Sequence, residues 1–132
     1  MSVGPRREAR ERALSLLYEA ESKDLAPGAL LDELPLPAEP FVADLVAGVG
    51  RHRARIDELI ERYAVDWPLE RMPVVDRNVL RLAVYELAER PDVPLGAVIS
   101  EAVELAKRYS TEESGRFVNG VLSSVAAEVR PG

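Results

Sequence analysis

Proline spacing constrains the fold of this chain more than any other feature. Ten prolines interrupt the sequence, and the segments between them repeat apolar residues every three or four positions. Proline is excluded from the interior of a regular helix but is favoured in its first turn. No segment alternates apolar and polar residues with the period of two that is typical of strands. The pattern therefore predicts an all-α fold.

The periodic segments give the positions of the helices. We expect helices at about 5–22, 27–34, 41–64, 74–89, 95–109 and 110–129. Gly48 and Gly50 each cost about 1 kcal/mol of helix stability relative to alanine, so the third segment is one helix or two that meet near Arg51. Ser110-x-x-Glu113 predicts a capping box at the start of the last helix. The sequence thus predicts a compact bundle of six to seven helices.

Chain length and one interruption of the helical pattern, at the seam from Trp67 to Pro73, indicate the domain organisation. A chain of 132 residues is long enough for one independent core. The turn from Trp67 to Pro73 interrupts the helical pattern near the middle of the chain. We expect a single domain over 1–132, made of two small helical subdomains at about 1–66 and 67–132.

Composition excludes several kinds of chemistry. The chain has no cysteine and a single histidine, His52, which excludes disulfides, thiol nucleophiles and multi-histidine metal sites. It also has no glycine-rich phosphate loop. We therefore expect no enzyme activity, no metal and no cofactor. Because no apolar run approaches the roughly 20 residues of a membrane span, we expect a cytoplasmic protein that does not bind membranes.

Charge is distributed unevenly along the chain. The formal net charge is −6, which by itself argues against nucleic acid as a partner. Residues 1–12 carry four arginines against two glutamates, a net charge of +2 that leaves −8 for the rest. A basic arm on an acidic body favours a selective anion site of modest affinity. Arg51, His52, Arg53 and Arg55 form a second basic cluster, but nearby acidic residues make a solvated helix face the simpler interpretation.

Two aromatic residues allow a structural and a functional interpretation. Tyr18 lies about 155° from the apolar stripe of the first helix, on one line with Arg7 and Leu14. It is either an ordinary surface tyrosine or an anchor for a partner. Phe117, at the edge of the last helix's stripe, is either peripheral core or a platform for an unpaired base beside Arg116.

Other residues of the helix at 74–89 and of the last helix have structural interpretations. In the helix at 74–89, Arg77 and Arg81 share the only polar line, and Asp76 in the first turn favours the helix dipole. Glu86 falls on the apolar side and needs an arginine or backbone partner. Gly120, in the middle of the last helix, suggests that another backbone approaches closely.

Three stretches resemble a known family. They are RREARERALSLLYEAE near the start, VLRLAVYEL at 79–87 and DVPLGAVISEAVELAKRYSTEESGRFVNGVLSSVA at 92–126. The EAVELAK and RFVNGVL pair is the most specific of these signals. The chain resembles the transcription antitermination protein NusB family from Arg6 to Pro131. One departure from the family pattern is the pair Pro73-Val74, which precedes Asp76.

The resemblance implies a fold of two small helical bundles and a function. It implies binding of boxA, a short single-stranded element of nascent RNA, together with the ribosomal protein NusE. The assembly joins RNA polymerase and resists premature termination, notably on ribosomal RNA operons. The resemblance leaves open whether the chain is a monomer or a homodimer.

The resemblance also assigns site residues by position. It places RNA contacts at the start of the first and last helices, and contacts with NusE at the outward tyrosine and the start of the helix at 74–89. The implied RNA-binding residues are Arg6, Arg7, Arg10, Glu113, Arg116 and Phe117, and the implied partner-binding residues are Tyr18, Asp76, Arg77 and Arg81.

Two alternatives stay open. A domain similar to NusB also precedes ribosomal RNA cytosine methyltransferases, where it helps to place the substrate. Those enzymes carry a catalytic cysteine, which this chain lacks, so that the chain would be a detached RNA-placing domain. The other alternative is a helical protein–protein adaptor that does not bind RNA.

Overall fold

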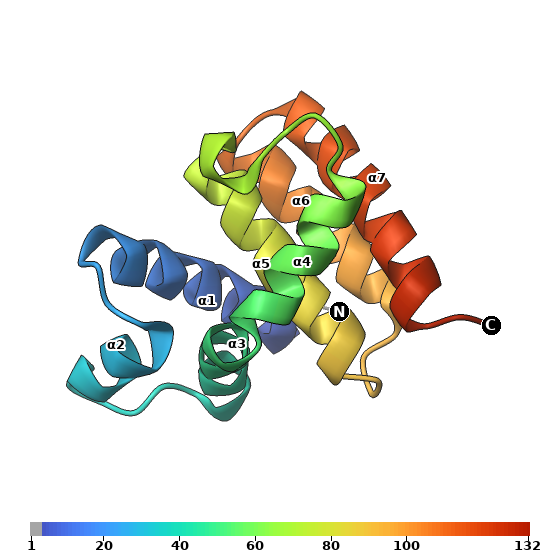
Figure 1. Ribbon diagram of the computed structural model, residues 1–132. Helices are drawn as coiled ribbons and strands as arrows, with labels where there is room; N and C mark the ends of the chain where they lie inside the picture. Colours follow the sequence, from blue (N-terminus) through green and yellow to red (C-terminus); the bar gives the residue numbers. More distant parts are fainter. Residues whose placement is uncertain (1–3) are drawn as a thin grey trace.

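The computed structural model describes residues 4–132, and all regular structure within them is helical (Figure 1). The all-α prediction is confirmed, and residues 1–3 of the predicted basic arm lie outside the described part. In chain order the elements are α1 (Gly4–Ser22), α2 (Pro27–Glu33), α3 (Pro40–Arg51), α4 (Arg53–Tyr63), the 3-10 turn η1 (Leu69–Arg71), α5 (Val74–Glu89), α6 (Leu95–Tyr109) and α7 (Glu112–Val129).

Prolines start helices as the sequence predicts. Pro27 and Pro40 occupy the first turns of α2 and α3. Pro73 and Pro94 directly precede α5 and α6 in extended conformations. A proline at these positions loses no helical hydrogen bond, because the first backbone N–H groups of a helix have no partner inside it.

The segment predicted at 41–64 is two helices, α3 and α4, which meet at His52. Gly48 lies inside α3 and not at the break. A Cβ atom there would lie 2.2 Å from Cζ of Tyr85, a residue of α5. The hydroxyl of Tyr85 donates a hydrogen bond of 2.9 Å to Asp44, and burial together with this bond raises the pKa of Tyr85 to about 12. Gly48 therefore allows α5 to pack closely on α3.

Helix α5 lies at the centre of the molecule (Figure 1). It packs against α1, α3 and α4 on one side and against α6 and α7 on the other. Its apolar residues belong to one continuous core that includes both halves of the chain. Helix α4 precedes the predicted seam at Trp67 but packs on α5 and α7, which follow it. The division into two subdomains stays a prediction.

The predicted capping box at Ser110 is wrong by one residue. Thr111 is the N-cap of α7, and its hydroxyl accepts a hydrogen bond of 2.9 Å from the backbone N–H of Ser114. Ser114 therefore occupies the third position of the helix, where the box requires Glu or Gln. Glu113 is one position earlier, and its side chain is 88% exposed.

Two predictions about packing are also wrong. Gly120 is exposed, and a Cβ atom there would meet no atom within 4 Å, so no backbone approaches it. Leu14 is buried and does not point outward with Tyr18. Helix α1 packs against α5 as well as α2 and α3, and its buried face is therefore wider than a single stripe.

Candidate nucleic-acid and partner interfaces

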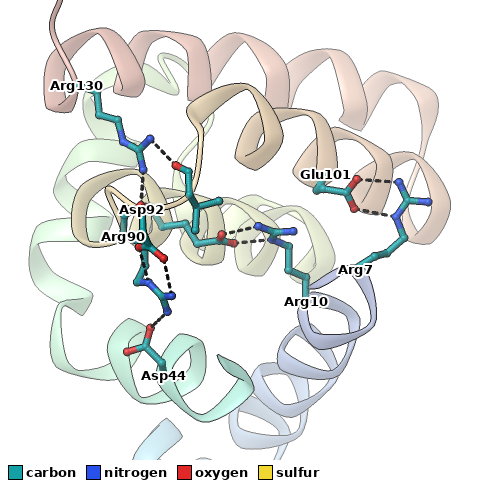
Figure 2. A network of polar contacts seen from close by, with 9 residues as sticks. Arg7, Arg10, Asp44, Arg90, Asp92, Glu101 and Arg130 are labelled. Carbon is teal, nitrogen blue, oxygen red and sulfur yellow. Dashed lines mark hydrogen bonds and ion pairs between the residues drawn. The ribbon is translucent and has the colours of Figure 1, made fainter. Parts of the chain in front are cut away.

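The three arginines predicted to bind RNA at the start of α1 occupy three different environments. Arg6 is exposed, and its guanidinium carbon lies 4.0 Å from the ring centroid of Phe41. Arg7 is partly exposed and donates two hydrogen bonds of 2.8 Å to Glu101 of α6. Arg10 is buried and donates bonds of 2.8 and 2.7 Å to Glu86 of α5. Figure 2 shows both arginine–glutamate contacts.

The contact of Arg10 with Glu86 confirms one expectation and corrects another. Glu86 lies on the buried face of α5 and has the arginine partner that the sequence requires. Because an isolated buried carboxylate is very costly, this partner has to be buried as well. Arg10 is consequently only 5% exposed, and its side chain is not presented to an RNA in this structure.

Phe41 and Arg90 lie beside Arg6 and form with it the arginine–aromatic surface, in which the Phe41 ring is itself only 8% exposed. Both line a cavity of about 480 Å³ together with Arg6, Glu39 and Pro40. The Arg90 guanidinium lies 4.9 Å from the Phe41 centroid and is held by Asp44 at 2.8 Å and Asp92 at 3.0 Å. These carboxylates raise the pKa of Arg90 above its ordinary value, with Asp92 the larger cause. The sequence analysis missed Phe41, whose only signal is an aromatic residue directly after a proline-rich loop.

A second arginine fixes the segment that carries Arg90. Arg130 donates hydrogen bonds to the backbone carbonyls of Glu86, Leu87, Arg90 and Val93. Figure 2 shows Arg130 above Arg90. These carbonyl groups lie at the carboxyl end of α5 and in the turn that follows, where helix carbonyls have no internal partner. Arg130 thus stabilises the end of α5 beside the arginine–aromatic surface.

The residues predicted at the start of α7 are exposed to different degrees. The side chain of Arg116 is 72% exposed and lies 3.9 Å from Glu113, a weak surface pair. Phe117 is half-buried, and its ring contacts Trp67 edge-on with centroids 4.6 Å apart. Phe117 is therefore part of the peripheral core, and its role as a platform for a base stays a prediction that its remaining exposure allows.

Helix α6 connects the two predicted RNA-binding sites. Its residues Glu101 and Arg108 contact Arg7 and Glu11 of α1, the latter at 2.7 Å. Lys107 packs beside Gly115 at the start of α7. No hydrogen bond or ion pair within residues 4–132 joins the α1 arginines to Arg116 directly. The sequence analysis missed Lys107 and Arg108, whose positions are ordinary for cations at the end of a helix.

The predicted partner-binding residues do not share one surface. Tyr18 is 56% exposed, which confirms its outward position. Asp76 and Arg81 are buried, the first against Ser114 and the second against Asp57. Arg77 is partly buried and pairs with Glu21. Asp76 and Arg81 therefore do not present their side chains to a partner in this structure, because α5 is enclosed by neighbouring helices.

An apolar groove lies beside Tyr18. It has a volume of about 410 Å³, and its apolar walls come from α1, α5 and α6. Tyr109, which is 49% exposed, donates a hydrogen bond of 3.1 Å to Glu11 at its edge. The groove is lined by Glu11, Leu14, Ser15, Tyr18, Val74, Val75, Asn78 and Tyr109.

The fold and the surface features indicate the class of protein. Residues 4–132 contain no cluster of three or more potential metal ligands, and no helix among them is long and apolar enough to cross a membrane. The surface instead carries an arginine–aromatic site and an apolar groove, which are typical of proteins that bind macromolecules. The fold and the surface thus define a helical binding domain.

Comparison with known proteins identifies the family. The NusB family model matches residues 7–127, so the chain belongs to the NusB family. The transcription antitermination protein NusB of Thermobifida fusca is 50% identical over 124 residues, which cover 91% of this chain and 87% of the relative. That of Myxococcus xanthus is 46% identical over 134 residues and covers 94% and 96%.

Solved structures give the same result. The structure of NusB from T. maritima matches with a TM-score of 0.87 at 40% identity, covering 97% of this chain and 94% of that one. A crystal structure of antitermination factors NusB and NusE in complex with dsRNA contains a chain that matches with a TM-score of 0.79 at 33% identity, covering 93% and 96%.

Proposed function

We propose that this chain is a transcription antitermination factor that binds boxA-type single-stranded RNA together with the ribosomal protein NusE. The complex would act on RNA polymerase in the cytoplasm and support transcription of ribosomal RNA operons. The proposal includes no catalytic step and no cofactor. Family membership supports it, as does the similarity to a NusB chain solved with NusE and RNA.

The observation that carries the proposal is the placement of two different surfaces on one helix. Helix α1 has Arg6 and Arg7 near its start and the exposed Tyr18 near its end. Arg7 and Tyr18 are 11 residues apart, which corresponds to about 16 Å along a helix. A partner at the groove of Tyr18 and an RNA at the arginines could therefore bind side by side, each with the surface chemistry that it requires.

The arginine surface suits an unpaired nucleic acid. Proteins that bind single strands combine cations for the phosphates with aromatic rings on which bases stack. Arg116 and the half-buried Phe117 provide this pair at the start of α7, and the exposed Arg6 adds a cation at the start of α1, where the Phe41 ring is buried. The exposed end of α6, with Lys107 and Arg108, lies between them and extends the cationic path.

Filter binding or fluorescence anisotropy with a labelled boxA RNA tests the proposal. The chain alone should bind weakly, because its net charge is −6, and addition of NusE should strengthen binding. A scrambled RNA and a duplex of the same length serve as controls. Equal affinity for boxA and scrambled RNA, with NusE present, would favour the adaptor without an RNA role.

A further inference from the structure

Two arginine–glutamate pairs stand one helical turn apart on α1 but differ in exposure. Both are bidentate and join α1 to a distant part of the chain. The side chains of Arg10 and Glu86 are 7% and 1% exposed, whereas those of Arg7 and Glu101 are 22% and 21% exposed. Opening the buried pair would strand a charge in the core, but the Arg7 pair can open into solvent.

The Arg7 pair lies directly beside the arginine–aromatic surface. Arg6, its neighbour in sequence, is exposed over Phe41, and no carboxylate within residues 4–132 forms an ion pair with it. Arg7 follows Arg6 about 100° further round α1, so an RNA that crosses the start of this helix can contact both side chains. The guanidinium of Arg7 is, however, already occupied by Glu101 in the two-bond geometry that a phosphate would also adopt.

We propose that Glu101 is an internal competitor for RNA phosphate, which masks Arg7 in the free protein and is displaced when RNA binds. This inference rests on the proposed function and adds a residue that regulates it. Exchange of one oxyanion for another on the same guanidinium preserves both charge-assisted hydrogen bonds. Arg7 is therefore expected to contribute less to unspecific attraction of polyanions than an unpaired arginine would.

The surroundings of Glu101 allow the exchange. After displacement from Arg7, an acidic side chain without cationic neighbours would repel the RNA. Arg7 is the main cause of the lowered pKa of Glu101, but Arg10 and Arg108 also lower it by their charges. Glu101 therefore keeps the charge interaction with Arg10 and Arg108, which are paired with Glu86 and Glu11, when Arg7 turns to a phosphate. Among residues 4–132, Glu101 is the one carboxylate that is hydrogen-bonded to Arg7, and Glu104 and Glu11 act on Arg7 by charge alone.

The competition predicts a signature in the salt dependence of binding. Neutralising one phosphate of a single strand releases counterions and steepens the salt slope by about 0.7. When Glu101 is displaced, its negative charge stays beside the bound phosphate and offsets the neutralisation by Arg7. The phosphate contact of Arg7 should thus be nearly invisible in the slope of the wild-type protein and fully visible when residue 101 is uncharged.

The test compares Glu101→Gln with Glu104→Gln in the full chain, with NusE present and a labelled boxA RNA. Both variants remove one negative charge from α6, but Glu104 is exposed and makes no hydrogen bond to Arg7. At low salt, Glu101→Gln should bind RNA about two- to fivefold more tightly than Glu104→Gln, the range that exposed ion pairs contribute. Its salt slope should be steeper by about 0.7.

Further measurements keep the outcomes distinct. Glu101→Asp keeps the charge on a shorter side chain and should raise affinity less than Glu101→Gln. A scrambled RNA should gain more affinity from Glu101→Gln than boxA does, because masking suppresses unspecific binding.

Two outcomes would contradict the proposals. If Glu101→Gln binds RNA no more tightly than Glu104→Gln with an equal salt slope, or binds less tightly, Glu101 positions Arg7 and does not mask it. If the wild-type protein with NusE does not prefer boxA, the proposed function itself is wrong.

Discussion

Ser114 at the start of α7 donates a hydrogen bond of 2.7 Å to the carboxylate of Asp76 at the start of α5, and both side chains are buried. The other carboxylate oxygen of Asp76 is buried without a partner among the described residues. The hydroxyls of Ser110 and Thr111 lie within 3.0 Å of the Ser114 hydroxyl. Asp76 thus joins the beginning of the central helix to the predicted RNA-binding end of α7.

Replacing Ser114 by alanine should destabilise the protein. The change leaves a buried carboxylate without any hydrogen-bond donor, which costs about 1–3 kcal/mol or more for a charged group. Urea unfolding of Ser114→Ala measures this loss. Ser123→Ala, at an exposed position of the same helix, is the matched control and should be nearly neutral. Equal stability of the two variants would show that the bond of Ser114 to Asp76 contributes little.

Arg10 and Arg6 should separate stability from RNA binding. Arg10→Ala leaves Glu86 buried and uncompensated, and removal of one partner of a buried ion pair typically costs about 3–5 kcal/mol. Arg6→Ala removes an exposed cation and should leave the unfolding free energy almost unchanged while it weakens RNA binding. Thermal unfolding and RNA anisotropy of both variants check this. If Arg10→Ala is as stable as the wild type but binds RNA more weakly, Arg10 contacts RNA and its pair with Glu86 contributes little to stability.

Tyr18→Asp should disrupt the complex with NusE, by weakening its affinity, without unfolding the chain. Tyr18 is more than half exposed beside an apolar groove, and replacing an interface aromatic by a charge should cost at least about 2 kcal/mol of binding. Calorimetric titration with NusE gives the change in affinity. Ser22→Asp, exposed at the end of the same helix but outside the groove, is the control. If Tyr18→Asp binds NusE as tightly as the wild type does, NusE does not bind at this groove.

Gly48→Ala should destabilise the fold although alanine is the better helix former. The added Cβ would overlap the rigid ring of Tyr85, and overpacking of this kind costs about 1–3 kcal/mol. Gly120→Ala, in open space within α7, should instead stabilise the chain by up to about 1 kcal/mol. Urea unfolding of the two variants should therefore give changes of opposite sign.

Glu128 should contribute to stability above a defined pH. Arg62 and then Tyr63, through their hydrogen bonds, hold the pKa of Glu128 below its ordinary value of 4.5. Because this pKa is lower in the folded state, the contribution is complete above about pH 5 and is lost as the pH falls through the folded pKa. Glu128→Gln should flatten the fall of unfolding free energy between about pH 5 and pH 3. An unchanged pH dependence in Glu128→Gln would show that the bonds of Arg62 and Tyr63 to Glu128 contribute little to stability.

The sequence by itself determined the helices and their buried faces. The segments 74–89 and 95–109 coincide with α5 and α6 because proline and apolar periodicity act locally, within a few residues along the chain. The same local geometry placed Tyr18 on the surface and Glu86 in the interior, where it needs an arginine or backbone partner. Characteristic stretches of sequence also identified the family, which the comparisons confirm.

Only the tertiary structure decided which charged side chains remain exposed to an RNA or a partner protein. Arg7 and Glu101 are 94 residues apart, and Arg10 and Glu86 are 76 apart, so no periodicity within one helix can pair them. The burial of Asp76 depends likewise on where α7 begins against α5. Helical periodicity gives the direction of a side chain on its own helix, whereas its exposure and its partner depend on which other helix packs there.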